Sequence, residues 1–158
     1  MEAGYTHVYT GEGKGKTTCA LGLALRASGA GKRVFFGQFL KGGEYSEIKA
    51  LKEFLPMITV EQFGKEVASG YKKAMSALTN GGYDIVILDE INTAVGKGLL
   101  SEQEEIALID AKPFQTELIL TGRHAADSVI EKADLVTEMR PVKHYFKNGV
   151  IARAGIEK

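Results

Sequence analysis

Residues 10–18 read TGEGKGKTT, and this glycine-rich stretch decides the fold. It stands between an apolar segment, residues 6–9, and an apolar helical pattern, residues 18–28, which is the context of a phosphate-binding loop. Glycines allow the backbone to curl so that successive N–H groups point inward, and the positive end of the following helix strengthens this anion site. Thr10 replaces the first glycine of the usual pattern. The stretch still predicts a site for a nucleoside triphosphate.

Individual side chains of this loop have predicted tasks. Lys16 is expected to reach the phosphates. The hydroxyl of Thr17 is expected to coordinate Mg²⁺, which usually takes one or two protein oxygens together with phosphates and water. The predicted nucleotide-binding residues of the loop are Gly11, Glu12, Gly13, Lys14, Gly15, Lys16, Thr17 and Thr18.

An acidic pair follows the strongest strand signal in the chain. Residues 85–88 are four consecutive apolar residues, and Asp89 with Glu90 comes directly after them. In open α/β sheets, ligands bind at the carboxyl ends of the strands. We therefore expect Asp89 and Glu90 to complete the magnesium site with Thr17; the alternative is a purely structural cap or hydrogen-bonding role.

Short apolar runs alternate with helical patterns along the whole chain. This rhythm predicts an α/β fold, in which helices cover both faces of a mostly parallel sheet. The predicted strands are residues 6–9, 33–39, 58–62, 85–88, 117–120 and 135–139. The helix over residues 18–28 is so apolar that we expect it to be buried.

Turn and capping residues refine this expectation. Ser46 is a candidate cap for a helix that stops at Pro56, and Ser101 with Glu104 forms a predicted capping box. Asn148 and Gly149 favour a tight two-residue turn, so residues 143–146 and 150–153 are expected to form an antiparallel hairpin at the C-terminus.

Length and composition limit the function classes. With 158 residues and 44% hydrophobic residues, the chain is expected to form one nucleotide-binding domain over residues 1–158. It has 20 basic and 20 acidic residues and no apolar run of about 20 residues, so neither nucleic acid nor a membrane is an expected partner. The single cysteine, Cys19, is expected to be a buried structural thiol, and the N-terminus shows no leader pattern, which favours the cytoplasm.

Several other polar residues have more than one interpretation. Arg123 follows a strand and a Thr-Gly turn, which favours a phosphate contact over a surface salt bridge. His144 beside Lys143 has three interpretations: a nucleotide contact, a cobalt contact or, by default, a structural hydrogen-bonding histidine. His7 and His124 show no metal-ligand spacing, so no protein-bound zinc is expected.

Five blocks of the chain together resemble one enzyme family. Residues 10–18, 38–42, 88–91, 121–123 and 140–146 are similar to the ATP:corrinoid adenosyltransferases of cobalamin synthesis and occur in the family's order. The resemblance implies a RecA-like P-loop domain, usually a homodimer, that moves the 5′-deoxyadenosyl group of ATP to Co(I) of a corrinoid and releases triphosphate. A flavoprotein is the implied electron donor.

The same resemblance implies roles for particular residues. Because Co(I) is itself the nucleophile, the protein's tasks are alignment and stabilisation of the leaving triphosphate. The triphosphate is implied to lie in the loop in the reverse sense to that of kinases. Lys14 is then a second phosphate ligand rather than a solvated loop lysine. The residues implied for catalysis and ATP are Lys14, Lys16, Arg123, Lys143 and His144, and those implied for the corrinoid are Gln38, Phe39, Lys41, Gly42 and Phe63.

Two segments depart from the family's better-known branch. The stretch before the first strand is shorter, and residues 63–65 stand where those relatives carry a longer aromatic segment against the corrinoid's lower face. No tryptophan is present, so Phe63, expected on an exposed loop, is the candidate substitute; Phe39 is either packing or a corrin contact. A RecA-like ATPase and a nucleotide-binding regulatory protein remain alternative functions.

Overall fold

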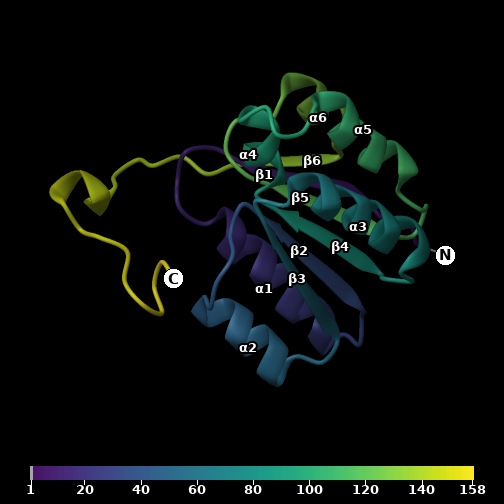
Figure 1. The fold of residues 1–158 in the computed structure, drawn as a ribbon, viewed down its shortest axis with the longest axis horizontal. Helices are drawn as coiled ribbons and strands as arrows, with labels where there is room; N and C mark the ends of the chain where they lie inside the picture. Colours follow the sequence, from purple (N-terminus) through teal and green to yellow (C-terminus); the bar gives the residue numbers. More distant parts are fainter. Residues whose placement is uncertain (1) are drawn as a thin grey trace.

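The fold alternates strands and helices, and a computed structural model describes it for residues 2–158 (Figure 1). The strands are β1 (Thr6–Thr10), β2 (Val34–Phe39), β3 (Ile58–Gly64), β4 (Ile85–Asp89), β5 (Glu117–Thr121) and β6 (Leu135–Glu138). The helices are α1 (Lys16–Gly29), α2 (Ser46–Phe54), α3 (Val67–Asn80), α4 (Ile91–Gly96), α5 (Glu102–Ala111) and α6 (Asp127–Lys132), and a 3₁₀ helix, η1, spans Tyr145–Asn148.

The six strands form one sheet in the order β3-β2-β4-β5-β1-β6. Every neighbouring pair is parallel. The inner strands β2 and β4 are buried at every position because helices cover both of their faces. Such strands are largely apolar rather than alternating, and Gln38 and Asp89 near the carboxyl ends are the polar exceptions. The expected α/β fold with a parallel sheet and helices on both faces is confirmed.

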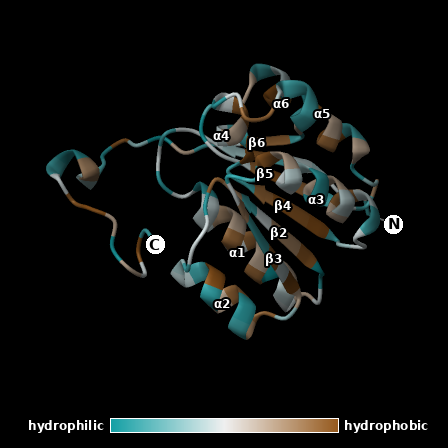
Figure 2. Cartoon of the chain, viewed as in Figure 1, coloured by the Kyte–Doolittle hydropathy of each residue, from teal (hydrophilic) through white to brown (hydrophobic). Residues whose placement is uncertain are grey.

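Two hydrophobic clusters, one on each face, hold the layers together. Helices α1 and α2 pack against one face, and α3, α4, α5 and α6 pack against the other (Figure 1). Figure 2 shows the apolar residues concentrated on the central strands between these layers. The arrangement leaves the carboxyl ends of the parallel strands open at one edge, where the loops can build a site.

Helix α1 is less buried than its composition predicts. Only Lys16, Ala20, Ala24 and Ala27 are buried, and Leu25 is 56% exposed. The expectation that Cys19 is buried is wrong, because it lies on the outward side of this one-sided helix and is exposed. Small residues face the sheet, so the helix packs closely through one narrow stripe.

The capping expectations have different outcomes. The Ser101–Glu104 capping box at α5 is confirmed: Ser101 N donates to Glu104 Oε2 at 2.8 Å, and Glu104 N donates to Ser101 Oγ at 3.2 Å. Ser46 is not a cap, because α2 already begins at Ser46 and its hydroxyl donates instead to the carbonyl oxygen of Lys158 at 3.1 Å.

The expected C-terminal hairpin is wrong. Residues 145–148 form η1, and β6 is the last strand of the sheet within residues 2–158. A tight hairpin turn of the Asn-Gly type needs positive φ at both central residues, but only Gly149, with φ of 80°, has it. The segment leaves the body as an extended arm and then returns toward the side of α1 and α2 (Figure 1). In the described part of the chain no helix is long and apolar enough to cross a membrane.

Candidate active site

The glycine-rich loop lies between β1 and α1 and is braced by the chain that follows β6. Gly13 N donates to the carbonyl oxygen of Met139 at 2.7 Å. A Cβ atom on Gly11 or Gly13 would lie 2.5 Å or 2.7 Å from that same oxygen. Gly11 also has φ of 98°. Glycine is therefore required here by close backbone approach as well as by backbone conformation.

Lys16 is folded over the loop. Its Nζ donates to the carbonyl oxygens of Gly11 at 2.7 Å and Gly13 at 2.8 Å. Burial lowers the pKa of Lys16, and the positive charge of Arg123 lowers it further. The ammonium group is thus held at the loop by neutral carbonyl oxygens, from which a phosphate could draw it because a charged acceptor makes the stronger hydrogen bond.

A buried carboxylate holds Thr17. Thr17 Oγ1 donates to Asp89 Oδ1 at 2.9 Å, Thr121 Oγ1 donates to the same oxygen at 2.7 Å, and Gln38 Nε2 donates to Asp89 Oδ2 at 2.9 Å. Asp89, Gln38 and Thr121 have no exposed surface. Three donors therefore fix the orientation of the Asp89 carboxylate and, through it, the hydroxyl of Thr17.

A row of side chains supports this carboxylate across three strands. The register pairs Gln38 of β2 with Gln62 of β3 on one side and with Asp89 of β4 on the other. Gln62 Nε2 donates to Gln38 Oε1 at 3.0 Å. Gln38, predicted as a corrinoid contact, therefore lies in the core and orients Asp89. Neither Gln62 nor Thr121 was predicted as a site residue, although both stand at strand ends beside residues that were.

Glu90 faces different partners from Asp89. It adopts a left-handed conformation, with φ of 64°, and its Oε2 accepts from Thr93 Oγ1 at 2.6 Å. Its Oε1 lies 3.8 Å from Lys41 Nζ. A left-handed non-glycine residue is conformationally costly and occurs often at functional sites. The two carboxylates thus point to separate parts of the site, one at Thr17 and one at Lys41.

Arg123 lies at the loop in an ion pair with Glu12. Arg123 Nη1 is 3.4 Å from Glu12 Oε2, and His124 Nε2 is 3.1 Å from Glu12 Oε1. Gly122 precedes them with φ of 134°, and a Cβ atom there would lie 2.7 Å from Thr93 N. The Thr-Gly turn thus places the guanidinium beside the phosphate loop in an exposed ion pair, which is the alternative weighed against a phosphate contact. His124 was not expected there.

Lys14 contacts the far end of the chain. Its Nζ donates to the carbonyl oxygen of Ile156 at 2.8 Å and lies 3.2 Å from Glu157 Oε1. A cavity adjoins this contact, and it is lined by Lys14, Thr17, Thr18, Leu21, Lys41, Ser46, Glu47 and residues 155–158. The sequence carries no periodic or motif signal for a contact between residues so far apart.

Other predicted residues lie away from the loop. Phe63 is part of β3, not of an exposed loop as expected, and it is buried with its ring 4.9 Å from that of Phe39. Lys143 and His144 lie on the extended arm, where His144 Nδ1 accepts from Phe146 N at 3.1 Å. Within the described residues, neither of them has a hydrogen bond or ion pair with residues 11–17. Gly42 is exposed after β2, next to Lys41.

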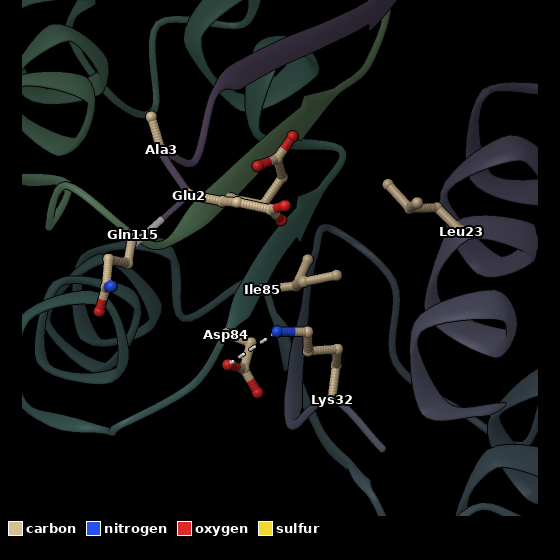
Figure 3. A pocket seen from close by; sticks show the side chains of 8 residues that line it. Glu2, Ala3, Leu23, Lys32, Asp84, Ile85 and Gln115 are labelled. Carbon is tan, nitrogen blue, oxygen red and sulfur yellow. Dashed lines mark ion pairs between the residues drawn. The ribbon is translucent and has the colours of Figure 1, made fainter. Parts of the chain in front are cut away.

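A second cavity opens at the opposite edge of the sheet, where β4 and β5 begin (Figure 3). Its lining mixes acidic side chains with Lys32, whose Nζ lies 3.8 Å from Asp84 Oδ1. It adjoins none of the predicted site residues.

In residues 2–158, no group of three or more His, Cys, Asp or Glu side chains is arranged to hold a metal ion. A cation at the phosphate loop would therefore depend on hydroxyl and phosphate oxygens as well.

Comparison with known proteins decides the family. Residues 2–157 match the family model described as ATP:corrinoid adenosyltransferase BtuR/CobO/CobP. The chain belongs to this family. The corrinoid adenosyltransferase of Escherichia coli (strain K12) is 37% identical over 169 residues, covering 99% of this chain and 86% of that protein. The corrinoid adenosyltransferase of Pseudomonas aeruginosa is 34% identical, covering 99% of this chain and 84% of that protein.

Other matches are either much longer than this chain or much less similar to it in sequence. The uncharacterized protein all2391 of Nostoc sp. is 37% identical over 98% of this chain, but the chain spans only 48% of its length. A RadB recombinase structure matches with a TM-score of 0.58 at 17% identity, over 90% of this chain and 77% of the recombinase. The cytoplasmic domain of EssC matches with a TM-score of 0.52 at 19% identity, over 96% of this chain and 35% of EssC. These structures show the RecA-like P-loop fold alone. Membership of the adenosyltransferase family does not favour the ATPase or regulatory alternatives.

Proposed function

We propose that this chain, acting as a single nucleotide-binding domain, transfers the 5′-deoxyadenosyl group of ATP to the Co(I) centre of a reduced corrinoid. Family membership supports the class of reaction. The structural observation that carries the proposal is the gathering of three cations, Lys14, Lys16 and Arg123, at one glycine-rich loop. Such a cluster suits a reaction whose leaving group takes three phosphates and their charge with it.

The proposed reaction needs no proton transfer. Co(I) attacks the 5′ carbon of the ribose, the Co–C bond forms, and the C–O bond to the α-phosphate breaks. The electron pair of that bond leaves with the triphosphate, and the cobalt becomes formally Co(III). The protein therefore needs to align the cobalt, the carbon and the leaving oxygen, and to stabilise negative charge on the triphosphate.

The cations reach the phosphates by exchanging partners that they hold in the present structure. Lys16 gives up the carbonyl oxygens of Gly11 and Gly13, and Arg123 gives up the exposed carboxylate of Glu12. An exposed ion pair contributes only about 0–1 kcal/mol, so the exchange of Arg123 costs little. Both side chains are already within reach of the loop.

The residues present fit a magnesium ion beside the phosphates. Thr17 donates its proton to Asp89, which turns the lone pairs of the hydroxyl outward. Mg²⁺ accepts one or two protein oxygens if phosphates and water supply the rest, and when bound it would neutralise charge on the triphosphate. We propose Thr17 as its direct ligand, Asp89 as the residue that orients Thr17, and Glu90 as a contact through water.

On the corrinoid side, exposure narrows the proposed contacts. Gln38, Phe39 and Phe63 are buried, whereas Lys41 is partly exposed and Gly42 is exposed at the same strand end. We propose Lys41 and Gly42 as corrinoid contacts and assign the three buried residues to the support of the site.

On the family resemblance we further propose that the protein is a cytoplasmic homodimer supplied with electrons by a flavoprotein.

A substitution at Lys16 tests the phosphate assignment. Under anaerobic conditions with ATP, Mg²⁺ and chemically reduced cobalamin or cobinamide, the wild-type protein should produce the visible spectrum of a Co–C bond. Lys16→Ala should lower kcat by about 10²-fold or more, as for other charge-stabilising groups. Lys72→Ala, at an exposed position of α3, should leave the rate unchanged. Full activity of Lys16→Ala would refute the assignment.

A further inference from the structure

The C-terminal residues 153–158, here called the C-terminal loop, fold into a compact turn. The carbonyl oxygen of Arg153 accepts from the backbone N of Ile156 at 3.2 Å, Glu157 at 3.0 Å and Lys158 at 3.2 Å. Gly155, with φ of 77°, allows the reversal of direction and donates to the carbonyl oxygen of Lys158 at 2.7 Å. The loop is therefore an organised element that carries its own hydrogen bonds.

Glu157 is the centre of this loop. Its carboxylate accepts from Arg153 N at 2.9 Å and Arg153 Nη2 at 3.1 Å, and also from the hydroxyl of Tyr145. The Arg153 guanidinium, followed by the Tyr145 hydroxyl, holds the pKa of Glu157 well below its usual range. The carboxylate is consequently ionised at neutral pH and kept in place by its neighbours.

The C-terminal loop joins the phosphate loop to the start of α2. Glu157 and the carbonyl oxygen of Ile156 both contact Lys14 Nζ in the phosphate loop, and the carbonyl oxygen of Lys158 contacts Ser46 at the start of α2. Of the three N–H groups of the Lys14 ammonium, two are therefore directed at the C-terminal loop. A phosphate group that binds Lys14 must compete with these acceptors.

We propose that the C-terminal loop is a latch that holds Lys14 while the phosphate loop is empty and releases it to the triphosphate. This inference rests on the proposed function, because it requires phosphates to bind at Lys14. The triphosphate carries more negative charge than Glu157 and therefore displaces it. Glu157 keeps Arg153 and Tyr145 as partners, so the latch remains organised when Lys14 leaves it.

The latch has a consequence for both binding and release. A site whose competent form is only partly populated binds its ligand more weakly by that fraction. The latch thus lowers the affinity for ATP and, equally, for the triphosphate product. When triphosphate leaves, Lys14 returns to Glu157 and to the carbonyl oxygen of Ile156. Release of a multiply charged product from a loop built to hold it is thereby made easier.

Glu157→Gln tests the latch, because it removes the charge while preserving the shape of the side chain. Binding of Mg·ATP and of Mg·tripolyphosphate, measured by calorimetry, should become about two- to fivefold tighter, the range expected for the loss of one partly exposed ion pair. Glu47→Gln is the matched control. Glu47 lines the same cavity, and the substitution should leave the affinity for Mg·ATP and Mg·tripolyphosphate nearly unchanged. In a Lys14→Ala background, Glu157→Gln should have no effect.

Three results would overturn the latch. Weaker binding by Glu157→Gln would mean that the loop clamps the nucleotide instead of competing with it. Equal tightening by Glu47→Gln would mean that only the overall charge of the cavity matters. A Glu157→Gln effect that persists without Lys14 would mean that Glu157 does not act through that lysine.

A fluorescent reporter beside the contact with Lys14 tests directly whether that side chain leaves the C-terminal loop. The protein contains no tryptophan, so Ile156→Trp places a unique fluorophore at a side chain that is 56% exposed. Its emission should change on titration with Mg·tripolyphosphate and saturate with the calorimetric Kd. An unchanged emission while calorimetry shows binding would reject the latch alone. If the wild-type protein bound neither ATP nor tripolyphosphate, the proposed function would fail and the latch with it.

Discussion

At the scale of single residues, the proposed magnesium site depends on how Asp89 is held. Its carboxylate is fully buried and accepts from Thr17, Thr121 and Gln38. In an asparagine at this position, an NH₂ group would replace one carboxylate oxygen and face another hydrogen-bond donor. Leaving such a buried group without a partner costs about 1–3 kcal/mol of folding free energy. The orientation of the Thr17 hydroxyl would be lost with it.

Asp89→Asn should therefore raise the Mg²⁺ concentration needed for half-maximal activity by about tenfold, the equivalent of roughly 1.4 kcal/mol. The measurement is a titration of adenosyl transfer with Mg²⁺ at saturating ATP. Asp110→Asn, which removes an exposed carboxylate paired with Lys132, is the control and should leave the titration unchanged. The same Mg²⁺ dependence in Asp89→Asn and wild type would contradict the role given to Asp89.

Glu105 of α5 is a buried acid, and neither of its carboxylate oxygens has a hydrogen-bond partner among residues 2–158. Burial, and next the negative charge of Glu102, raises the pKa of Glu105 from 4.5 to about 7. The folded protein therefore keeps a proton that the unfolded chain loses above pH 4.5. Stability falls as the pH rises from about 4.5 to about 7 and levels off above that range.

Glu105→Gln should remove this loss, because an amide carries no charge at any of these pH values. Denaturant unfolding should show the variant about 1–3 kcal/mol more stable than wild type at pH 8, with a much smaller difference at pH 5. Glu131→Gln, an exposed change on α6, is the control and should alter stability little at either pH. A difference independent of pH would contradict the burial of an ionisable Glu105.

At the scale of elements, α5 owes part of its stability to its first turn. The Ser101–Glu104 capping box satisfies two backbone N–H groups that the helix itself leaves without partners. Ser101→Ala should lower the free energy of unfolding by about 1 kcal/mol. Ser76→Ala, at an exposed mid-helix position of α3, should not destabilise the protein. An equal loss in both variants would show that the cap contributes nothing specific.

Elements whose signals are local were predicted from the sequence, and those that depend on distant contacts were not. The β4 run and the α5 capping box are contained in a few adjacent residues, and both are present. The Asn148-Gly149 signal is also local, but an isolated two-stranded hairpin is marginal in water, and η1 forms instead. Strand β3 extends past Phe63 because Gly64 pairs with Phe39 across a register shift, and the sequence does not reveal that pairing.

The candidate site shows the same division. The loop residues 11–17 and the acids after β4 were predicted because motif and strand end coincide in the sequence. The support of Asp89 by Gln38 requires the strand order β3-β2-β4, which no local pattern states. The contact of Lys14 with Glu157 joins residues 143 positions apart and depends on the path of the whole C-terminal arm.

At the scale of the whole molecule, the parallel sheet brings the parts of the site to one edge. The phosphate loop follows β1, Lys41 follows β2, the acidic pair lies at the end of β4, and Arg123 follows β5. Parallel strands end at the same edge, so four separate segments meet there. The family assignment gives the class of reaction, and in the proposed function the phosphate loop at this edge holds a leaving group rather than a group to be transferred.

The stoichiometry of products tests that account most directly. In one anaerobic incubation with ATP, Mg²⁺ and chemically reduced corrinoid, the adenosylcorrinoid is quantified from its visible spectrum and the phosphate products by anion-exchange chromatography. Adenosyl transfer predicts one equivalent of inorganic triphosphate for each Co–C bond formed. Release of ADP and phosphate with no change in the corrinoid spectrum would contradict it.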